Sequence, residues 1–305
     1  MVRVHPGPQF ILSMPELPEV ETIAGDLNRK VKDAVILDFW TDWAKAVKTD
    51  LAEFKKAISG KKILEVKRRG KNLLFYLSGK VVMHVHLKMT GHLLVKSEKL
   101  SASGGKVKSY FNERVNQYIH HIWFLKKGGK KIEMEFSDLR KFAKIRLLKA
   151  DEIEMDSDLG RLGIEPLSDK FTLKKFKEIL LKKEKWATRD ILMEQSLIAG
   201  IGNIYVSEIL FEAGVMPKRQ ARELDEKEIK EIYRSIKMVL KKAVKLRGTS
   251  DSDYRDTDGA PGGFQKVLKV YNREGSACQR KNCRGIVVRE KHKQRSAFFC
   301  EVCQK

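Results

Sequence analysis

The sequence predicts an α+β protein with three parts: a β-sandwich preceded by an N-terminal helix, a helical region, and a C-terminal β-hairpin that carries four cysteines. Three observations support this fold class. Short segments in which apolar and polar residues alternate fill the first half of the chain. Apolar residues at helical spacing follow them. All four cysteines lie beyond residue 277, in two close pairs.

The first expected element is a short helix that begins within "MPELPEVETI", residues 14–23. Pro18 suits a first helical turn, where its missing N–H would have no intrahelical partner. Val20, Ile23, Leu27 and Val31 recur at helical spacing and therefore share one face of this helix.

Seven strand-like runs follow, and turns such as "RRGK" and "KKGGKK" separate several of them. Many short strands joined by tight turns favour a β-sandwich. We interpret the polar stretch 97–109 as a flexible surface loop. The runs cover residues 34–40, 62–68, 72–77, 81–87, 118–125, 131–136 and 143–148.

The region after residue 150 is helical. Thr172 can cap one helix, and Asp225 with Glu228 forms a capping box for a longer one. Between these helices, "AGIGN" puts two glycines ahead of an apolar helix that begins near Asn203. Such a helix start can present free backbone N–H groups to a phosphate, but its glycines can equally serve close helix packing. These residues alone leave both interpretations open.

A segment rich in Gly, Ser and Asp, residues 248–264, comes after the helices. Its composition predicts a mobile loop.

The cysteines have the spacing of a tetrahedral zinc site. Four residues separate Cys278 from Cys283, two separate Cys300 from Cys303, and sixteen lie between the pairs. Four thiolates leave no open position for water, so the predicted Zn²⁺ is structural. Disulfides are the alternative, and a cytosolic location disfavours them. Residues 266–305 carry eleven Lys and Arg against three Glu, a net of +8, which points to a phosphate clamp on this hairpin.

The whole chain is strongly basic, with 62 Lys and Arg against 40 Asp and Glu and a formal net charge of +22. Such an excess favours a polyanionic partner, because each neutralised phosphate releases counterions. A basic protein of another kind, such as a ribosome-associated one, is the alternative. No apolar run approaches the ~20 residues that span a membrane. The "FIL" run near the start is too short for the core of a signal peptide. We therefore expect a cytoplasmic protein.

Several motifs then occur in the order found in formamidopyrimidine-DNA glycosylases, the family that also contains endonuclease VIII. They are "PELPEVET", "RRGKNLLF", "HLKMTGHL", "LRKF", "LGIEPLS", "LMEQSLIAGIGNIYVSE", "DGAPGGFQKVLKVY" and "QRSAFFCEVC". The chain resembles this family from Met14 to its end. The resemblance implies an extension over 1–13 that is absent from the mature protein, a catalytic β-sandwich domain (14–150), a helix–two-turns–helix DNA-binding domain (151–247), a lesion-recognition loop (248–265) and a zinc finger (266–305).

The resemblance also implies a reaction, base excision followed by strand cleavage. It makes the amine of Pro15 the nucleophile and Glu16 the adjacent proton shuttle. Lys71 would assist elimination and contact phosphate, and Arg295 would grip the phosphates beside the extruded nucleotide. Only a free amine can attack, since an internal proline nitrogen is an amide with a delocalised lone pair. We therefore expect translation to start at Met14 and the initiator Met to be removed.

The remaining implied residues bind DNA. Asn203 matches a phosphate-contacting asparagine, and Met89, Arg140 and Phe142 match residues that fill the space left by the extruded base. Without the resemblance, Met89 and Phe142 would be assigned to the core, Lys71 to the surface and Asn203 to a helix cap. The implied partner is double-stranded damaged DNA, bound by a monomer that is nucleoid-associated in a prokaryote.

Two alternatives remain beside an enzyme for oxidised purines. A sister glycosylase for oxidised pyrimidines normally has Gly where Leu17 stands and lacks the purine lid. A catalytically silent DNA-damage-binding protein becomes the better interpretation if Pro15 stays internal. Arg189, Glu194 and Lys88 depart from the family pattern, where lysine, aspartate and glycine are usual, which leaves the lesion preference open.

Overall fold

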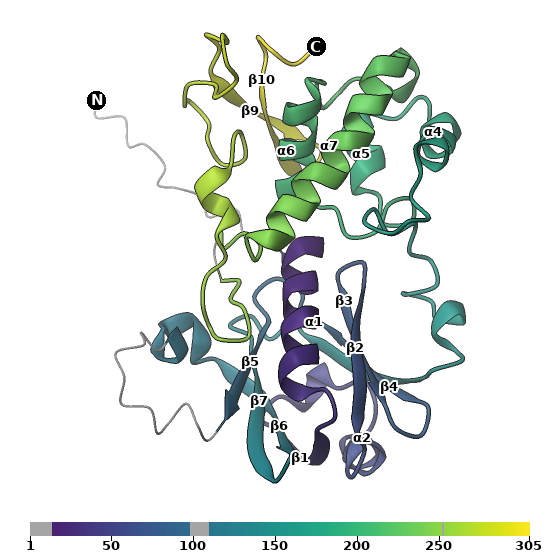
Figure 1. Ribbon diagram of the computed structural model, residues 1–305, viewed down its shortest axis with the longest axis vertical. Coiled ribbons are helices and arrows are strands. Elements are labelled where there is room, and N and C mark those ends of the chain that lie inside the picture. The colour runs from purple at the N-terminus through teal and green to yellow at the C-terminus, as the bar shows by residue number, and fades with distance from the viewer. Residues whose placement is uncertain (1–13, 98–109, 252) are drawn as a thin grey trace.

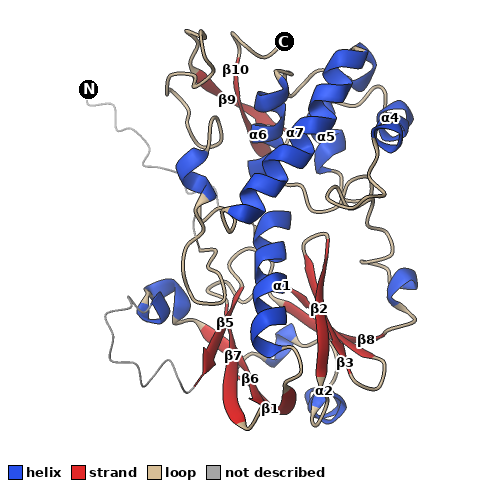
Figure 2. Cartoon of the chain, in the orientation of Figure 1, coloured by secondary structure: helices blue, strands red, loops and turns tan. Residues whose placement is uncertain are grey.

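The computed structural model describes residues 14–97, 110–251 and 253–305. They form two lobes stacked along the long axis of the molecule (Figure 1). Both four-stranded sheets lie in one lobe together with α1 (Leu17–Val31) and α2 (Leu51–Ile58), whereas the longer remaining helices and a two-stranded hairpin make up the other (Figure 2). The extension expected at 1–13 lies outside the described residues, as does the loop expected at 97–109 except for Ser97, which ends a strand. Among the residues that are described, no helix has the length and apolarity that a bilayer crossing requires.

The helices and strands confirm the predicted α+β class. The β lobe contains α1 (Leu17–Val31), β1 (Val35–Thr41), α2 (Leu51–Ile58), β2 (Ile63–Arg69), β3 (Asn72–Leu77), β4 (Val81–His86), β5 (His92–Ser97), β6 (Ile119–Lys127), β7 (Lys130–Ser137) and β8 (Lys144–Lys149). The helical lobe contains α4 (Leu173–Lys182), α5 (Thr188–Met193), α6 (Asn203–Ala213), α7 (Glu226–Lys245), β9 (Val287–His292) and β10 (Arg295–Cys300).

Two antiparallel four-stranded sheets form the β lobe, in the orders β1-β6-β7-β5 and β2-β3-β4-β8. Apolar side chains from both sheets and from α1 share one core, which includes Phe39, Phe75 and Trp123. The predicted apolar face of α1 lies in this core, where Val20 and Ile23 are fully buried. The tight-turn pattern in the sequence therefore predicted the sandwich correctly.

The sequence did not indicate α2 or β5. The α2 helix has eight residues and only two buried side chains, Phe54 and Ile58, so it carries little periodic signal. Its start is nevertheless well defined, because the Asp50 carboxylate accepts hydrogen bonds from the backbone N–H groups of Ala52 (2.9 Å) and Glu53 (3.0 Å).

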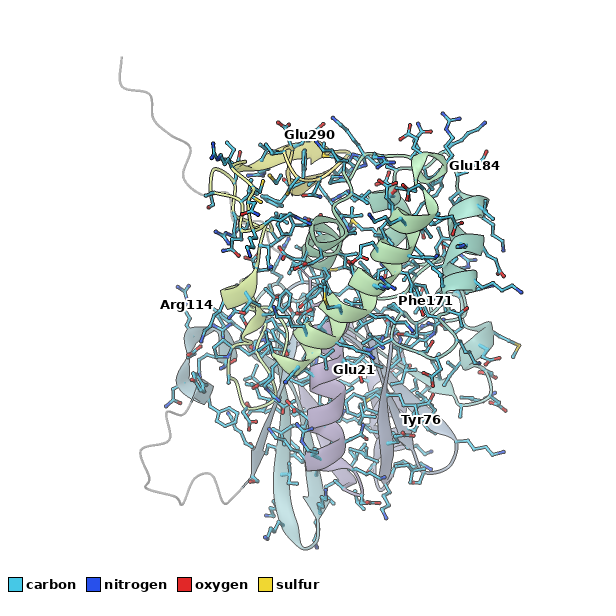
Figure 3. The ribbon with its side chains drawn as sticks, turned by 45° about the horizontal axis from the view of Figure 1, so that its top comes forward. Glu21, Tyr76, Arg114, Phe171, Glu184 and Glu290 are labelled. Atoms are coloured by element: carbon cyan, nitrogen blue, oxygen red, sulfur yellow. The ribbon has the colours of Figure 1, made fainter. Side chains whose placement is uncertain are left out.

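The second core fills the helical lobe and surrounds α6, whose residues 204–206 and 209–211 are almost fully buried. Both predicted helix caps are present. Thr172 accepts a hydrogen bond from the Lys175 N–H, and Asp225 with Glu228 forms the capping box of α7. In Figure 3, Glu290 on β9 and Tyr76 on β3 mark opposite ends of the molecule.

The first turn of α1 joins the two lobes. Leu17 packs in the core of the helical lobe, although the rest of α1 belongs to the core of the sandwich. Its N–H donates to the Gly200 carbonyl at 3.0 Å. Gly200 has φ +94°, and a Cβ there would lie 2.7 Å from the Leu17 Cβ, so only glycine permits this approach. The chain at Pro15 and Glu16 is thereby held at the junction between the lobes.

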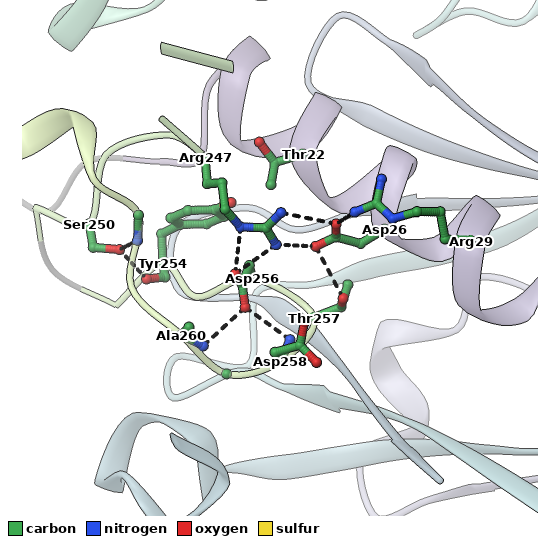
Figure 4. Close-up of polar contacts among 12 residues, drawn as sticks. Thr22, Asp26, Arg29, Arg247, Ser250, Tyr254, Asp256, Thr257, Asp258 and Ala260 are labelled. Carbon is green, nitrogen blue, oxygen red and sulfur yellow. Dashed lines mark hydrogen bonds and ion pairs between the residues drawn. The ribbon is translucent and has the colours of Figure 1, made fainter. Parts of the chain in front are cut away.

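The Gly-rich segment 248–264 runs from α7 toward the sandwich, and part of it differs from the expected mobile loop. Tyr254, Asp256 and Thr257 are buried. The Arg247 guanidinium bonds the carboxylates of Asp256 (2.7 Å) and of Asp26 on α1 (2.5 Å), as Figure 4 shows. This part of the segment is tied to α1 by ion pairs that its local composition does not reveal.

Candidate active site

A cavity of about 380 Å³ lies at the junction of the lobes. Side chains from the segment just before α1, from the β2–β3 and β4–β5 turns, from the start of α6, from the segment between α7 and β9, and from the β9–β10 hairpin line it. They are Met14, Glu16, Lys71, Met89, Asn203, Tyr271, Arg289, Gln294, Arg295 and Ser296. Five of the predicted site residues, Glu16, Lys71, Met89, Asn203 and Arg295, are therefore brought together from segments far apart in the sequence.

Glu16 is 2% exposed and directs its carboxylate at the N-terminus of α6. It accepts hydrogen bonds from the backbone N–H groups of Gly202 (2.8 Å), Ile204 (2.9 Å) and Tyr205 (3.4 Å). Burial raises the pKa of Glu16 above that of an ordinary carboxyl, although Lys71 and these three N–H donors oppose the shift. Glu16 is thus better able than a solvated glutamate to carry a proton near neutral pH.

The sequence left two interpretations of "AGIGN", and the structure corrects the one based on free N–H groups. Those groups are not free, because an internal anion, the carboxylate of Glu16, already occupies the helix N-terminus. Gly202 also serves close packing. A Cβ at Gly202 would collide with the Glu16 carboxylate and lie 2.7 Å from the Lys71 Nζ. The absence of a side chain at Gly202 therefore leaves room for the Glu16 carboxylate and the Lys71 ammonium beside it.

Lys71 is 8% exposed and follows Gly70 in the β2–β3 turn. Burial lowers the pKa of its ammonium, with a further lowering from Arg295, whereas Glu16 acts in the opposite direction. A lysine with a lowered pKa is neutral more often and can accept a proton. Without the resemblance, the sequence would have assigned Lys71 to the surface.

Pro15 is buried, and Met14 stands between it and the cavity. In the chain as described, the Pro15 nitrogen is part of the Met14–Pro15 peptide bond. Met14 lines the cavity beside Glu16 and Lys71, and Pro15 follows it directly in the chain.

Arg295 lies at the start of β10, exposed, on the hairpin turn that overhangs the cavity. The turn is docked on α5, because Asp190 binds His292 (2.9 Å) and Lys293 (2.6 Å). Arg189, the departure from the family's lysine, is 3% exposed and donates from Nη2 to the Asn203 Oδ1 at 2.6 Å. With its oxygen engaged, the Asn203 amide keeps its N–H donors for other partners.

Met89, Arg140 and Phe142 form one cluster at the edge of the cavity. The Arg140 Nη1 lies 3.1 Å from the Met89 sulfur, and its guanidinium lies 4.6 Å from the centre of the Phe142 ring. Asp138 holds this turn by accepting from the N–H groups of Arg140 (3.3 Å) and Ala143 (2.9 Å). Phe142 is 49% exposed and is therefore not a core residue.

Tyr271 and Arg289 also line the cavity, and the sequence analysis assigned them no role. Tyr271 is fully buried, and burial raises the pKa of its hydroxyl. Arg289 donates to the Ser296 hydroxyl across the hairpin at 2.9 Å. The end of "DGAPGGFQKVLKVY" marks Tyr271 in the sequence, whereas Arg289 has no signal beyond the basic character of the hairpin.

The four cysteines gather at the base of the hairpin, with all sulfur atoms within 4.8 Å of one another. The Cys278–Cys303 and Cys283–Cys300 sulfurs are each 3.7 Å apart. A tetrahedral site with Zn–S bonds of about 2.3 Å has edges of about 3.8 Å, so the donor set fits zinc. The N–H groups of Arg280 and Gly285 each approach a cysteine sulfur at 3.4 Å.

Two family models match successive parts of the chain. Residues 14–145 match the formamidopyrimidine-DNA glycosylase N-terminal domain, and residues 162–254 match the formamidopyrimidine-DNA glycosylase H2TH domain. The chain is 39% identical to the formamidopyrimidine-DNA glycosylase of Carboxydothermus hydrogenoformans, over 96% of this chain and 100% of that one. It is 36% identical to that of Pelotomaculum thermopropionicum, over 96% and 99%.

Solved structures agree. A Lactococcus lactis Fpg in complex with DNA containing an abasic site has a TM-score of 0.80 at 30% identity, covering 95% of this chain and 99% of that chain. A complex of LlFpg with a THF-DNA and an inhibitor has the same TM-score and identity.

The fold and these matches define a DNA glycosylase of base-excision repair. The chain belongs to the formamidopyrimidine-DNA glycosylase family.

Proposed function

We propose that this protein excises oxidised purines, such as 8-oxoguanine and formamidopyrimidines, from duplex DNA and then cleaves the strand as an AP lyase. The observation that carries the proposal is the buried pair of Glu16 and Lys71, which lies beside the position that the Pro15 nitrogen would occupy in a chain freed of Met14. The match to the N-terminal domain begins at residue 14, in keeping with a functional chain that starts at Pro15.

In the proposed reaction the Pro15 amine attacks C1′ and the glycosidic bond breaks, with the bonding electrons leaving on the base. The amine then loses its proton and the C1′–O4′ bond breaks, with O4′ taking up a proton, so that the opened sugar is held as an iminium, a Schiff base on the proline ring. Its positive charge acidifies the C2′ proton, so removal of that proton breaks the C3′–O bond by β-elimination. A second elimination breaks the C5′–O bond. A free proline amine suits this role, because a fraction is unprotonated near neutral pH.

The two buried side chains supply the proton transfers. Glu16, with its raised pKa, delivers a proton to the sugar or the departing base. Lys71, with its lowered pKa, accepts a proton during elimination. Because the three α6 N–H groups hold the Glu16 carboxylate in place, it can lose and regain its proton without moving.

Other cavity residues would bind the DNA. Arg295 and Asn203 contact the phosphates beside the extruded nucleotide, and the cluster of Met89, Arg140 and Phe142 fills the vacated stack. The net charge of +22 supports a nucleic-acid partner. We infer that a monomer binds double-stranded damaged DNA, which in a prokaryote would place the protein in the cytoplasm on the nucleoid.

We further propose that Cys278, Cys283, Cys300 and Cys303 hold one structural Zn²⁺. The tetrahedral spacing of their sulfurs supports this assignment. When bound, the ion supplies a cross-link and no reactive centre. The cysteines themselves hold the hairpin strands at the end remote from Arg295.

The alternative for oxidised pyrimidines is less well supported, because Leu17 stands where that sister glycosylase normally has Gly, and because segment 248–264 resembles the lid that closes over an oxidised purine. A silent DNA-binding protein would result if residues 1–14 were retained.

Borohydride trapping on duplexes with 8-oxoguanine opposite cytosine tests the proposal. A protein that starts at Pro15 should form a covalent adduct with the DNA. The form that starts at Met1 is the matched control, since its Pro15 nitrogen is an amide and should trap nothing. Equal trapping by both forms would move the nucleophile to another amine, with Lys71 the first suspect. The intact mass of the native protein identifies which form the cell makes.

A further inference from the structure

A second cavity, of about 500 Å³, lies on the other side of Met89 from Glu16 and Lys71. We call it the lysine pocket. Met14 and Met89 line both cavities. The other residues of the lysine pocket are Trp43, Lys45, Ala46, Lys48, Lys88, Lys141, Phe142 and Ala143. It therefore contains four lysines and no carboxylate.

The four ammonium groups are gathered without counter-charges. Among the residues that the structure describes, none of them lies within ion-pair distance of an acidic side chain, whereas lysines elsewhere, such as Lys30 and Lys144, are paired. Lys45 and Lys141 share one aromatic ring, with their Nζ atoms 5.4 and 4.9 Å from the centre of Trp43. Like charges held together in this way repel one another, and a bound anion relieves that repulsion.

The backbone gives a second, independent observation. Lys88 has φ 57° and Lys141 has φ 56°, in the left-handed region that disfavours a lysine and favours glycine. Non-glycine residues in this region cost of order 1 kcal/mol and tend to collect at functional sites. Both lysines line the lysine pocket, although glycine would fit the backbone better at these two positions.

We propose that the lysine pocket binds the phosphodiester backbone of the undamaged strand, opposite the lesion. The inference rests on the proposed function, which places Met89, Arg140 and Phe142 in the space of the extruded nucleotide. The damaged strand then lies on the side of Glu16, Asn203 and Arg295. The undamaged strand then lies on the other side of the cluster of Met89, Arg140 and Phe142. There it passes over the lysine pocket, whose lining includes Met89 and Phe142.

The charge and the shape of the pocket both suit this occupant. Phosphate groups are spaced along the strand, and four lysines on a short arc can neutralise more than one of them. Trp43 is only partly exposed, and two ammonium groups lie over its ring, so it positions the lysines and leaves little free face for stacking a base.

The main experiment measures the salt dependence of binding to a duplex that carries a tetrahydrofuran abasic analogue. This probe needs no excision, so binding is measured separately from the chemistry. Lys45→Ala with Lys48→Ala should lower the slope of log affinity against log salt by about two, because two phosphate contacts are lost. The matched control is Lys130→Ala with Lys131→Ala, two exposed lysines at the start of β7 that remove the same charge and should leave the slope within experimental error.

Neutral methylphosphonate linkages then identify the strand. Placed opposite the lesion in the undamaged strand, they should weaken binding by the wild type and have little further effect on the Lys45/Lys48 variant. Placed in the damaged strand, they should weaken both proteins equally. If the variant instead becomes insensitive to methylphosphonates in the damaged strand, or keeps the wild-type salt slope, the proposal is overturned.

A third variant separates binding from folding. Lys88→Gly with Lys141→Gly relieves two left-handed lysines, so its thermal stability should equal or exceed that of the wild type while its DNA affinity falls. Unchanged affinity in this folded variant would contradict the proposal. Borohydride trapping on 8-oxoguanine duplexes, run on the wild type in parallel, reports on the proposed function alone. Failure of that reaction is therefore distinguishable from failure of the lysine pocket.

Discussion

At the scale of single residues, the active site is controlled by what burial does to a few ionisable side chains. One poorly solvated region at the N-terminus of α1 contains Glu16, Glu19 and Lys71. Glu19 accepts from the Glu16 N–H (2.8 Å), from the Thr249 N–H (2.6 Å) and from the Tyr205 hydroxyl. It therefore links the turn that carries Glu16 to the start of segment 248–264.

Glu19 leads to a prediction about stability and pH. Burial, and secondarily the charge of Glu16, raises the pKa of Glu19 to about 7 from a usual 4.5. The folded state binds the proton of the Glu19 carboxyl more tightly than the unfolded state does. This proton binding therefore stabilises the fold fully below pH 4.5, and the stabilisation is lost as pH rises through about 7. Glu19→Gln removes the titration. The free energy of unfolding of the variant minus that of the wild type should therefore rise by up to about 3 kcal/mol from pH 4.5 to pH 8.

Urea unfolding of both proteins across this range is the measurement. Burial lowers the pKa values of His84 and His92 to about 4. Their contribution to the free energy of unfolding therefore has the opposite pH dependence, because it decreases as pH falls. They contribute equally to both proteins and cancel in the difference. A difference that is flat with pH would mean that Glu19 is solvated or ionised throughout.

At the scale of elements, two short segments are held by side chains that are distant from them in the sequence or in separate pairs, the four cysteines and the ion pairs of Arg247. The β9–β10 hairpin is narrow, yet it must hold Arg295 over the cavity. The segment after α7 is held to α1 by the guanidinium of Arg247, between Asp26 and Asp256 (Figure 4). Asp26 is 1% exposed, so its charge is almost fully removed from water.

The hairpin prediction concerns metal. Cys300→Ser should release the single zinc, loosen the hairpin and weaken duplex binding, while the β lobe, which has its own core, stays folded. Metal content by mass spectrometry, together with duplex binding, measures this. A metal-free preparation of the wild type with undiminished DNA affinity would show that the cross-link has no part in positioning Arg295.

The prediction for the loop concerns its ion pairs. Arg247→Met leaves Asp256 buried without a cation and leaves Asp26 with Arg29 alone, so the free energy of unfolding should fall by about 2 kcal/mol. The expected loss is smaller than for a fully buried pair because the Arg247 side chain is 39% exposed. Denaturant unfolding gives this value, and limited proteolysis within 248–264 should become faster. Unchanged stability and proteolysis would indicate that hydrogen bonds elsewhere hold the segment.

At the scale of the whole molecule, the site exists only because α1 bridges two lobes with separate cores. The β lobe supplies Lys71 and the cluster around Arg140, and the helical lobe supplies Asn203 and the hairpin. A DNA strand in the cavity would contact both lobes, so substitutions on either side affect the same substrate by different routes.

Lys71→Ala and Arg295→Ala should therefore cause different defects, one in the reaction and one in DNA binding. Arg295 is exposed on the hairpin, and its loss should weaken binding and lower the salt slope by about one. Lys71 is buried beside Glu16, and its loss should slow excision or elimination more than it weakens binding to an abasic-site duplex. Salt-dependent binding and single-turnover excision on both variants distinguish the two roles. A Lys71 variant with only a binding defect would make Lys71 a phosphate contact and no catalyst.

The sequence by itself determined the features that depend on neighbouring residues. Strand 72–77, the capping box at Asp225 and the four-cysteine spacing are all recognisable from a few positions, because periodicity, caps and ligand spacing are local properties. The family motifs added the site residues.

Only the tertiary structure decided how those residues work. Glu16 meets Gly202 across 186 positions, and that contact both fills the α6 N-terminus and buries Lys71. The pairing of Arg247 with Asp26 spans 221 positions, and the lysine pocket gathers side chains from three separate segments, around residues 45, 88 and 141. Burial and electrostatic coupling depend on which distant segments come into contact when the two lobes form around α1. Local patterns of residues do not predict those contacts.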